Sequence, residues 1–245
     1  MSTTIDAGEV SAVLFDMDGV LTDTASVHMA AWARLFDDAL PVLAPDVAHP
    51  PFSDEDYRRL VDGRPRIDGV EAVLADRGIR LPRGTPDDPP GDDTTWALAN
   101  RKNGHFHAAI EVQGVATFPS SIAVLDALRT AGVPVAVVTA SRNRVDILAA
   151  AGLADRFDAA VDGTDIEDEG LAGKPAPDTF LEAARRLGVD ASRAVVVEDA
   201  TSGVAAGAAG GFGLVIGVAR HDDPEELLAA GAHVVVADLA EVTVT

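Results

Sequence analysis

The sequence lacks cysteine, has few positive charges and contains no long apolar run. Without cysteine, disulfide bonds and thiol chemistry are excluded. No apolar run reaches the roughly 18 residues of a membrane span. The N-terminal segment MSTTIDAGEV has neither the basic part nor the apolar core of a signal peptide. We therefore expect a cytoplasmic protein without a membrane partner.

Positive charge is scarce, because 19 Lys and Arg residues stand against 40 Asp and Glu residues and the formal net charge is −21. Nucleic acid is therefore a poor candidate partner, and so is an anionic membrane surface. An anionic substrate would also be repelled at long range, so a phosphate site must use a few local cations, helix N-termini and a metal ion. Lysine occurs only at Lys102 and Lys174, which makes both candidate functional residues.

The 245 residues, 47% of them hydrophobic, are enough for a sizeable core. At the start of the chain and from Val115 onward, apolar strand-like runs alternate with helical segments, which is typical of a doubly wound parallel α/β sheet. Strands are predicted at 10–15, 133–139, 159–162, 194–198, 214–218 and 233–236, and helices at 120–131, 143–151, 177–187 and 203–209.

The stretch between these two parts has helical patterning instead. Helices are predicted at 25–40, 53–61, 69–77 and 94–113, with Pro-rich loops at 41–52 and 82–93. We therefore predict a core domain of residues 1–25 and 113–245, interrupted by a helical domain of residues 26–112.

The first predicted strand ends abruptly in Asp16-Met17-Asp18-Gly19. Ligands of open α/β sheets bind beyond the carboxyl ends of the strands, so the two carboxylates stand where chemistry is expected. Gly19 allows a sharp turn and a close approach to a ligand. The alternative is an acidic turn that merely ends a strand.

Three further segments place polar groups at or near strand ends. Thr139 follows a strand at a helix entrance and suits a phosphate, Glu198-Asp199 suits a hard cation such as Mg²⁺, and Lys174 lies in the stiff loop Gly-Lys-Pro-Ala-Pro. Each also has an ordinary interpretation, as a helix cap, a solvated turn or an exposed loop lysine.

Together these stretches resemble motifs I to IV of the haloacid dehalogenase-like (HAD) phosphotransferases, in family order. The resemblance implies a Rossmann-like HAD core with an inserted helical cap. It also implies that Asp16 is the nucleophile and Asp18 the general acid/base, with Thr139 and Lys174 as further catalytic residues. Mg²⁺ would be held by Asp16, Asp18 through its backbone carbonyl, Asp199 and Glu198.

A finer resemblance, to the β-phosphoglucomutase-like subfamily, covers the segments 16–25, 101–103 and 139–143 together with His28, Trp32 and Arg66. It implies interconversion of β-glucose 1-phosphate and glucose 6-phosphate through an aspartyl-phosphate and a bisphosphate, by a monomer acting on a phosphorylated sugar. Thr24 and His28 would support cap closure and Asp18. The implied substrate-binding residues are Thr24, His28, Gly63, Arg66, Lys102, Asn103, Ala140, Ser141, Arg142 and Asn143.

Two departures leave the sugar open: Asp62 stands where some mutases have Lys, and the loops 41–52 and 82–93 are long. The first alternative is a sugar-phosphate phosphatase with the same residues, in which water attacks the aspartyl-phosphate. The second is a non-catalytic module that binds phosphate.

Overall fold

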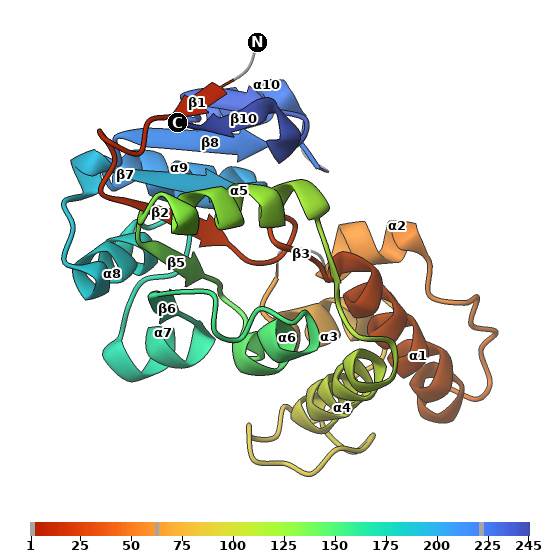
Figure 1. Ribbon diagram of the computed structural model, residues 1–245. Coiled ribbons are helices and arrows are strands. Elements are labelled where there is room, and N and C mark those ends of the chain that lie inside the picture. The colour runs from red at the N-terminus through yellow and green to blue at the C-terminus, as the bar shows by residue number, and fades with distance from the viewer. Residues whose placement is uncertain (1–2, 62–63, 221–222) are drawn as a thin grey trace. The chain divides into compact units, whose positions relative to one another are not determined.

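The computed structural model describes residues 3–61, 64–220 and 223–245. The chain divides into two compact units (Figure 1). The first, called the core unit below, comprises Met1–Thr24 and Val115–Thr245, and the second, the helical unit, comprises Ala25–Gly114.

The core unit contains a six-stranded parallel sheet in the order β6-β5-β2-β7-β8-β9. This confirms the predicted α/β class. β2 lies between β5 and β7, so residues that end these three strands are neighbours at one edge of the sheet. The strands are β2 (Ala12–Asp16), β5 (Val135–Val138), β6 (Ala159–Val161), β7 (Ala194–Glu198), β8 (Leu214–Val218) and β9 (Val234–Val236).

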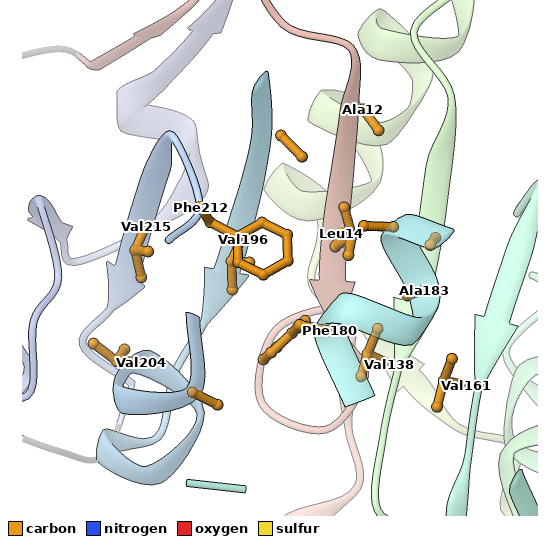
Figure 2. Packing of buried hydrophobic residues seen from close by; sticks show 14 of the residues in the cluster. Ala12, Leu14, Val138, Val161, Phe180, Ala183, Val196, Val204, Phe212 and Val215 are labelled. Atoms are coloured by element: carbon orange, nitrogen blue, oxygen red, sulfur yellow. The ribbon is translucent and has the colours of Figure 1, made fainter. Parts of the chain in front are cut away.

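One face of this sheet packs on helices α8, α9 and α10. Alternate strand residues such as Leu14, Val138 and Val196 point to this face and meet Phe180 and Phe212 in one buried cluster (Figure 2). The helices of the core unit are α5 (Pro119–Thr130), α6 (Arg144–Ala150), α7 (Gly163–Glu169), α8 (Asp178–Leu187), α9 (Thr201–Ala209) and α10 (Pro224–Ala229).

Several short elements of the core unit were not predicted. β1 (Thr3–Ile5) pairs in parallel with β10 (Val242–Val244), and β3 (Thr22–Asp23) pairs antiparallel with β4 (Ala116–Thr117). The helices α7 and α10 and the 3₁₀ turns at Ala191–Arg193 and Leu239–Glu241 were also missed. The two-residue strands β3 and β4 and the terminal strands β1 and β10 carry too little periodicity to be read from sequence, because pairing between distant segments creates them.

The first predicted strand began two residues too early. The Val10 amide donates to the Asp6 carbonyl in a turn, 3.1 Å away, and β2 begins at Ala12. Most other predicted ends of core elements differ from the observed ones by one or two residues, as expected where helices and strands fray.

The helical unit consists of α1 (Ala25–Leu43), α2 (Asp54–Asp56), a π-helical turn (Tyr57–Val61), α3 (Arg66–Asp76) and α4 (Thr95–Gln113). Trp32, Phe36 and Leu98 belong to its buried cluster. Ser53 caps α2 in a capping box with Asp56. α3 begins at Arg66 rather than at the predicted Gly69. Residues 62 and 63, which follow the predicted helix 53–61, lie outside the described residues. No helix among the described residues is long and apolar enough to cross a membrane.

Candidate active site

Asp16 is the last residue of the central strand β2, and its side chain accepts a hydrogen bond from the Lys174 ammonium. The chain turns back directly after it. Gly19 has φ +86°, and its amide donates to the Thr22 carbonyl at 2.8 Å. A residue with a side chain is disfavoured at this φ, so glycine allows the turn that keeps Asp18 next to Asp16.

Asp18 is held by two threonine hydroxyls. Thr24 Oγ1 donates to Asp18 Oδ1, and Thr139 Oγ1 donates to Asp18 Oδ2 at 3.2 Å. Thr139 Oγ1 in turn accepts from the Ser141 amide at 3.0 Å. Burial raises the pKa of Asp18 above its ordinary value, although the two hydroxyls act in the opposite direction. A carboxyl that keeps its proton to higher pH is suited to act as a general acid.

Lys174 lies between Asp16 and Glu198, and its Nζ is 2.6 Å from Glu198 Oε1. Burial lowers the pKa of Lys174, but the charges of Asp16 and Glu198 and their hydrogen bonds raise it above its ordinary value. Lys174 is therefore an ammonium ion in the site, which supplies a buried positive charge beside Asp16.

The Glu198 side chain is fully engaged within the core unit. Oε1 accepts from Lys174, and Oε2 accepts from the Ala200 amide at 2.7 Å. Only 2% of the residue is exposed. These contacts hold Lys174 in place, and the role of Glu198 as a metal ligand stays a prediction.

Asp199 lies against the loop that follows β2. A Cβ on Gly19 would be 1.9 Å from Asp199 Oδ2, so only glycine at position 19 leaves room for this carboxylate. Burial, with the negative charges of Glu198 and Asp16, raises the pKa of Asp199 to about 9. Asp16, Glu198 and Asp199 thus crowd three acids around one lysine, and a further cation would relieve their repulsion.

Within the described ranges, no group of three or more His, Cys, Asp or Glu side chains is arranged to hold a metal ion. Mg²⁺ nevertheless prefers oxygen ligands. The site offers the carboxylates of Asp16 and Asp199 and the backbone carbonyl oxygens of the turn from Asp16 to Gly19. Mg²⁺ keeps several waters and needs only one or two protein carboxylates, so this donor set fits it.

The segment 140–143 connects β5 to α6 and packs on the start of α7. The Gly163 amide donates to the Ser141 carbonyl at 3.1 Å, and a Cβ on Gly163 would be 2.5 Å from the Ala140 carbonyl oxygen. The Asn143 amide donates to Ser141 Oγ at 3.1 Å. The exposed Arg142 guanidinium pairs with Glu167 of α7 at 3.1 Å. This segment thus has a defined shape that depends on α7.

The helical unit holds a second group of predicted residues. Lys102 Nζ is 2.7 Å from His28 Nδ1. The same Nζ is 5.0 Å from the ring centroid of Trp32 and 5.0 Å from that of Phe106. His28 stacks on Phe106 at 4.3 Å. Burial, followed by the charges of Lys102 and Arg66, holds the pKa of His28 well below its ordinary value, so Nδ1 of a neutral imidazole faces the ammonium.

The structure therefore places the predicted residues in two groups, one in each unit. Gly63 lies outside the described residues. The group in the core unit consists of Asp16, Asp18, Thr24, Thr139, Lys174, Glu198 and Asp199. The group in the helical unit consists of His28, Arg66 and Lys102. The predicted residue Asn103 contacts His107 through its side-chain Nδ2.

Sequence reasoning missed Gly203, which lies in the first turn of α9. A Cβ at this position would be 1.7 Å from Glu198 Oε1. Gly203 therefore makes room for the carboxylate that holds Lys174. The available signal was a glycine four residues after Asp199, at the start of a helix otherwise rich in alanine.

Comparison with known proteins identifies the family. Residues 10–211 match the family described as haloacid dehalogenase-like hydrolase. The chain is 48% identical over 240 residues to a β-phosphoglucomutase of Mycobacterium tuberculosis, covering 95% of this chain and 91% of that protein. A β-phosphoglucomutase of Bacillus subtilis is 30% identical over 210 residues, with coverage of 85% and 84%.

A crystal structure of a HAD family hydrolase from Deinococcus radiodurans, with bound phosphate and sodium, has a TM-score of 0.68 at 31% identity. The match covers 95% of this chain and 93% of the Deinococcus radiodurans chain. The chain belongs to the haloacid dehalogenase-like family, in its β-phosphoglucomutase-like subfamily. It is an enzyme, a phosphotransferase or a phosphatase, which confirms the predicted enzyme and rejects the alternative of a non-catalytic module.

The Gly203→Ala variant tests how the lysine is held. The added methyl group displaces the Glu198 carboxylate and weakens a charged hydrogen bond of about 1.5–3 kcal/mol. We expect turnover to fall roughly 10- to 100-fold with the fold retained, measured by steady-state kinetics and circular dichroism. Gly104→Ala is the matched control, because nothing lies within 4 Å of a Cβ there, and wild-type turnover is expected. Equal activity of both variants would contradict the steric argument.

The pKa of Asp199 predicts how the stability of the metal-free protein depends on pH. An unfolded Asp ionises near pH 3.9, whereas the folded value is about 9. The folded state therefore binds an extra proton between these values, and stability is lost as pH rises through this range. We expect the Tm in chelator to fall from pH 5 to pH 9, and to fall less in Asp199→Asn. Asp87→Asn, at an exposed loop position, serves as control and should keep the wild-type profile; identical profiles for all three proteins would exclude this contribution.

Proposed function

We propose that this enzyme is a Mg²⁺-dependent β-phosphoglucomutase, which interconverts β-glucose 1-phosphate and glucose 6-phosphate. The observation that carries the proposal is the pairing of Asp16 with the Lys174 ammonium beside an Asp18 that two threonines hold. The 48% identity to the mycobacterial β-phosphoglucomutase supports the choice of substrate.

The site must first overcome electrostatic repulsion. A carboxylate that approaches a phosphate dianion is repelled, and burial strengthens the repulsion. Lys174 offsets part of it beside the transferring group. Mg²⁺, held by Asp16, Asp199 and the backbone carbonyl of Asp18, would neutralise further charge on the phosphoryl oxygens and orient them.

Asp16 then acts as the nucleophile and Asp18 moves the proton. The phosphoryl group of phosphorylated Asp16 passes to the 6-hydroxyl of β-glucose 1-phosphate, and Asp18 accepts the hydroxyl proton. The resulting glucose 1,6-bisphosphate then reverses its orientation in the site, so that its other phosphate faces Asp16. Asp16 attacks its other phosphorus, the C1 oxygen leaves, and Asp18 returns the proton to that oxygen. Glucose 6-phosphate and phosphorylated Asp16 are the products of this half-reaction.

The phosphate that does not react needs its own cations, because the net charge of the protein opposes binding. In this proposal the helical domain of residues 26–112 acts as the cap and supplies Arg66, Lys102 and Asn103. The core unit supplies the segment Ala140–Asn143, in which Arg142 offers a planar guanidinium suited to phosphate.

The alternative is a sugar-phosphate phosphatase. The matched family is described as hydrolase, and water in place of the sugar hydroxyl would release phosphate from the same Asp16 intermediate. The two functions differ only in the group that attacks the aspartyl-phosphate, so the products distinguish them.

The deciding experiment supplies Mg²⁺, β-glucose 1-phosphate and a trace of glucose 1,6-bisphosphate, and measures glucose 6-phosphate and free phosphate together. We expect glucose 6-phosphate to be the main product. Asp16→Asn should abolish its formation and the trapping of labelled phosphate on the protein, because an amide is not a nucleophile. Free phosphate as the main product would establish the phosphatase, and turnover by Asp16→Asn would overturn the mechanism.

Arg66→Ala tests the binding of the phosphate that does not react. Loss of a charged hydrogen bond of about 1.5–3 kcal/mol should lower glucose 6-phosphate formation roughly 10- to 100-fold. Hydrolysis of acetyl phosphate, which has one phosphate, should change little. Arg64→Ala is the neighbouring control, since Arg64 is exposed, and both activities should stay at the wild-type level. A parallel loss of both activities in Arg66→Ala would show that Arg66 does not bind this phosphate.

A further inference from the structure

Lys174 has a third neighbour besides its two carboxylates. Its Nζ lies over the ring of Phe180, 4.9 Å from the ring centroid. Phe180 belongs to α8, six residues after Lys174, and lies near the carboxyl end of β2 (Figure 2). The face of an aromatic ring carries partial negative charge and attracts an ammonium ion, most strongly where water is excluded.

The position of this ring is well defined. Phe180 is fully buried, and it packs edge-on against Phe212, with centroids 6.1 Å apart and an angle of 71° between the planes. Both rings belong to the cluster that covers one face of the sheet. The core therefore presents a ring face to the ammonium at a fixed place.

We propose that Phe180 is a positioning residue for phosphoryl transfer, whose ring face keeps the Lys174 ammonium in place while the charge of its partner Asp16 changes. This inference rests on the proposed role of Asp16 as nucleophile.

The need for such a neighbour follows from the reaction. When Asp16 forms a bond to phosphorus, its carboxylate becomes an acyl phosphate and no longer carries its own negative charge. Lys174 then keeps Glu198 as its carboxylate partner. The phosphoryl oxygens keep the charge they had in the substrate, and the negative charge lost by Asp16 passes to the leaving oxygen or, where Asp18 protonates that oxygen, to the Asp18 carboxylate. The partial negative charge of the Phe180 ring face is the same at every stage of the reaction. The ring therefore holds the ammonium next to Asp16 both when Asp16 is a free carboxylate and when it is an acyl phosphate.

Fluorination of the ring tests this directly. Phe180 is replaced site-specifically by 4-fluoro-, 3,5-difluoro- and 3,4,5-trifluorophenylalanine, which withdraw charge from the ring face in steps and nearly keep its shape. The readout is the single-turnover rate of aspartyl-phosphate formation from acetyl phosphate at saturating Mg²⁺. We expect the rate to fall with each fluorine, to about one tenth with three.

The same substitutions at Phe212 are the matched control, because Phe212 lies in the same cluster and packs on Phe180 itself. The rate of aspartyl-phosphate formation should not change with the number of fluorines at Phe212. Phe180→Leu, which removes the ring, should lose at least as much rate as the trifluoro variant with a smaller change in KM.

A flat series at Phe180, or equal slopes at Phe180 and Phe212, would overturn the positioning role and leave Asp16 as the nucleophile. If the unmodified enzyme forms no aspartyl-phosphate, the proposed function fails as well. Equal rates in Phe180→Leu and the unmodified enzyme would also overturn the role of the ring.

Discussion

The site depends on one buried ammonium ion. Lys174 lies between Asp16 and Glu198, and each of the three groups would be costly to bury alone. Removal of Lys174 leaves two buried carboxylates without their shared cation in the core unit. The sheet places Asp16 and Glu198 at the ends of adjacent strands, and Gly203 leaves the space that Glu198 occupies. The fold thus brings unlike charges together at one edge of the sheet, with more acids than lysines.

This local balance matters because the whole chain is strongly acidic, with a formal net charge of −21. Long-range attraction cannot deliver an anionic substrate to such a protein, so affinity must come from contacts made on arrival. The two lysines are both held by neighbouring side chains, one among carboxylates and the other against His28 and two aromatic rings. Since His28 is held neutral, it adds no charge of its own to the helical unit.

The parallel sheet was predictable because its strands are short apolar runs separated by helical patterns. Once the strands are parallel, Asp16, Thr139 and Glu198 must meet at one edge, so the outline of the site follows from sequence as well. The side-chain contacts between neighbouring strand ends and loops do not follow from the sequence. The orientation of the Glu198 side chain toward Lys174 depends on the Ala200 amide and on the absence of a side chain at Gly203. The link from Thr139 to Asp18 spans 121 positions of sequence, and α7 is a seven-residue helix with little apolar periodicity.

The hydrogen bond from Thr24 to Asp18 joins two properties that are usually treated separately. Thr24 is the last residue of the core unit before the chain enters the helical unit. Its hydroxyl favours the ionised form of Asp18, so the equilibrium for proton binding at Asp18 depends on the backbone conformation of Thr24. Thermodynamic linkage makes this dependence reciprocal. Each proton that Asp18 gains or loses therefore changes the free energy of the Thr24 conformation that places its hydroxyl on Asp18.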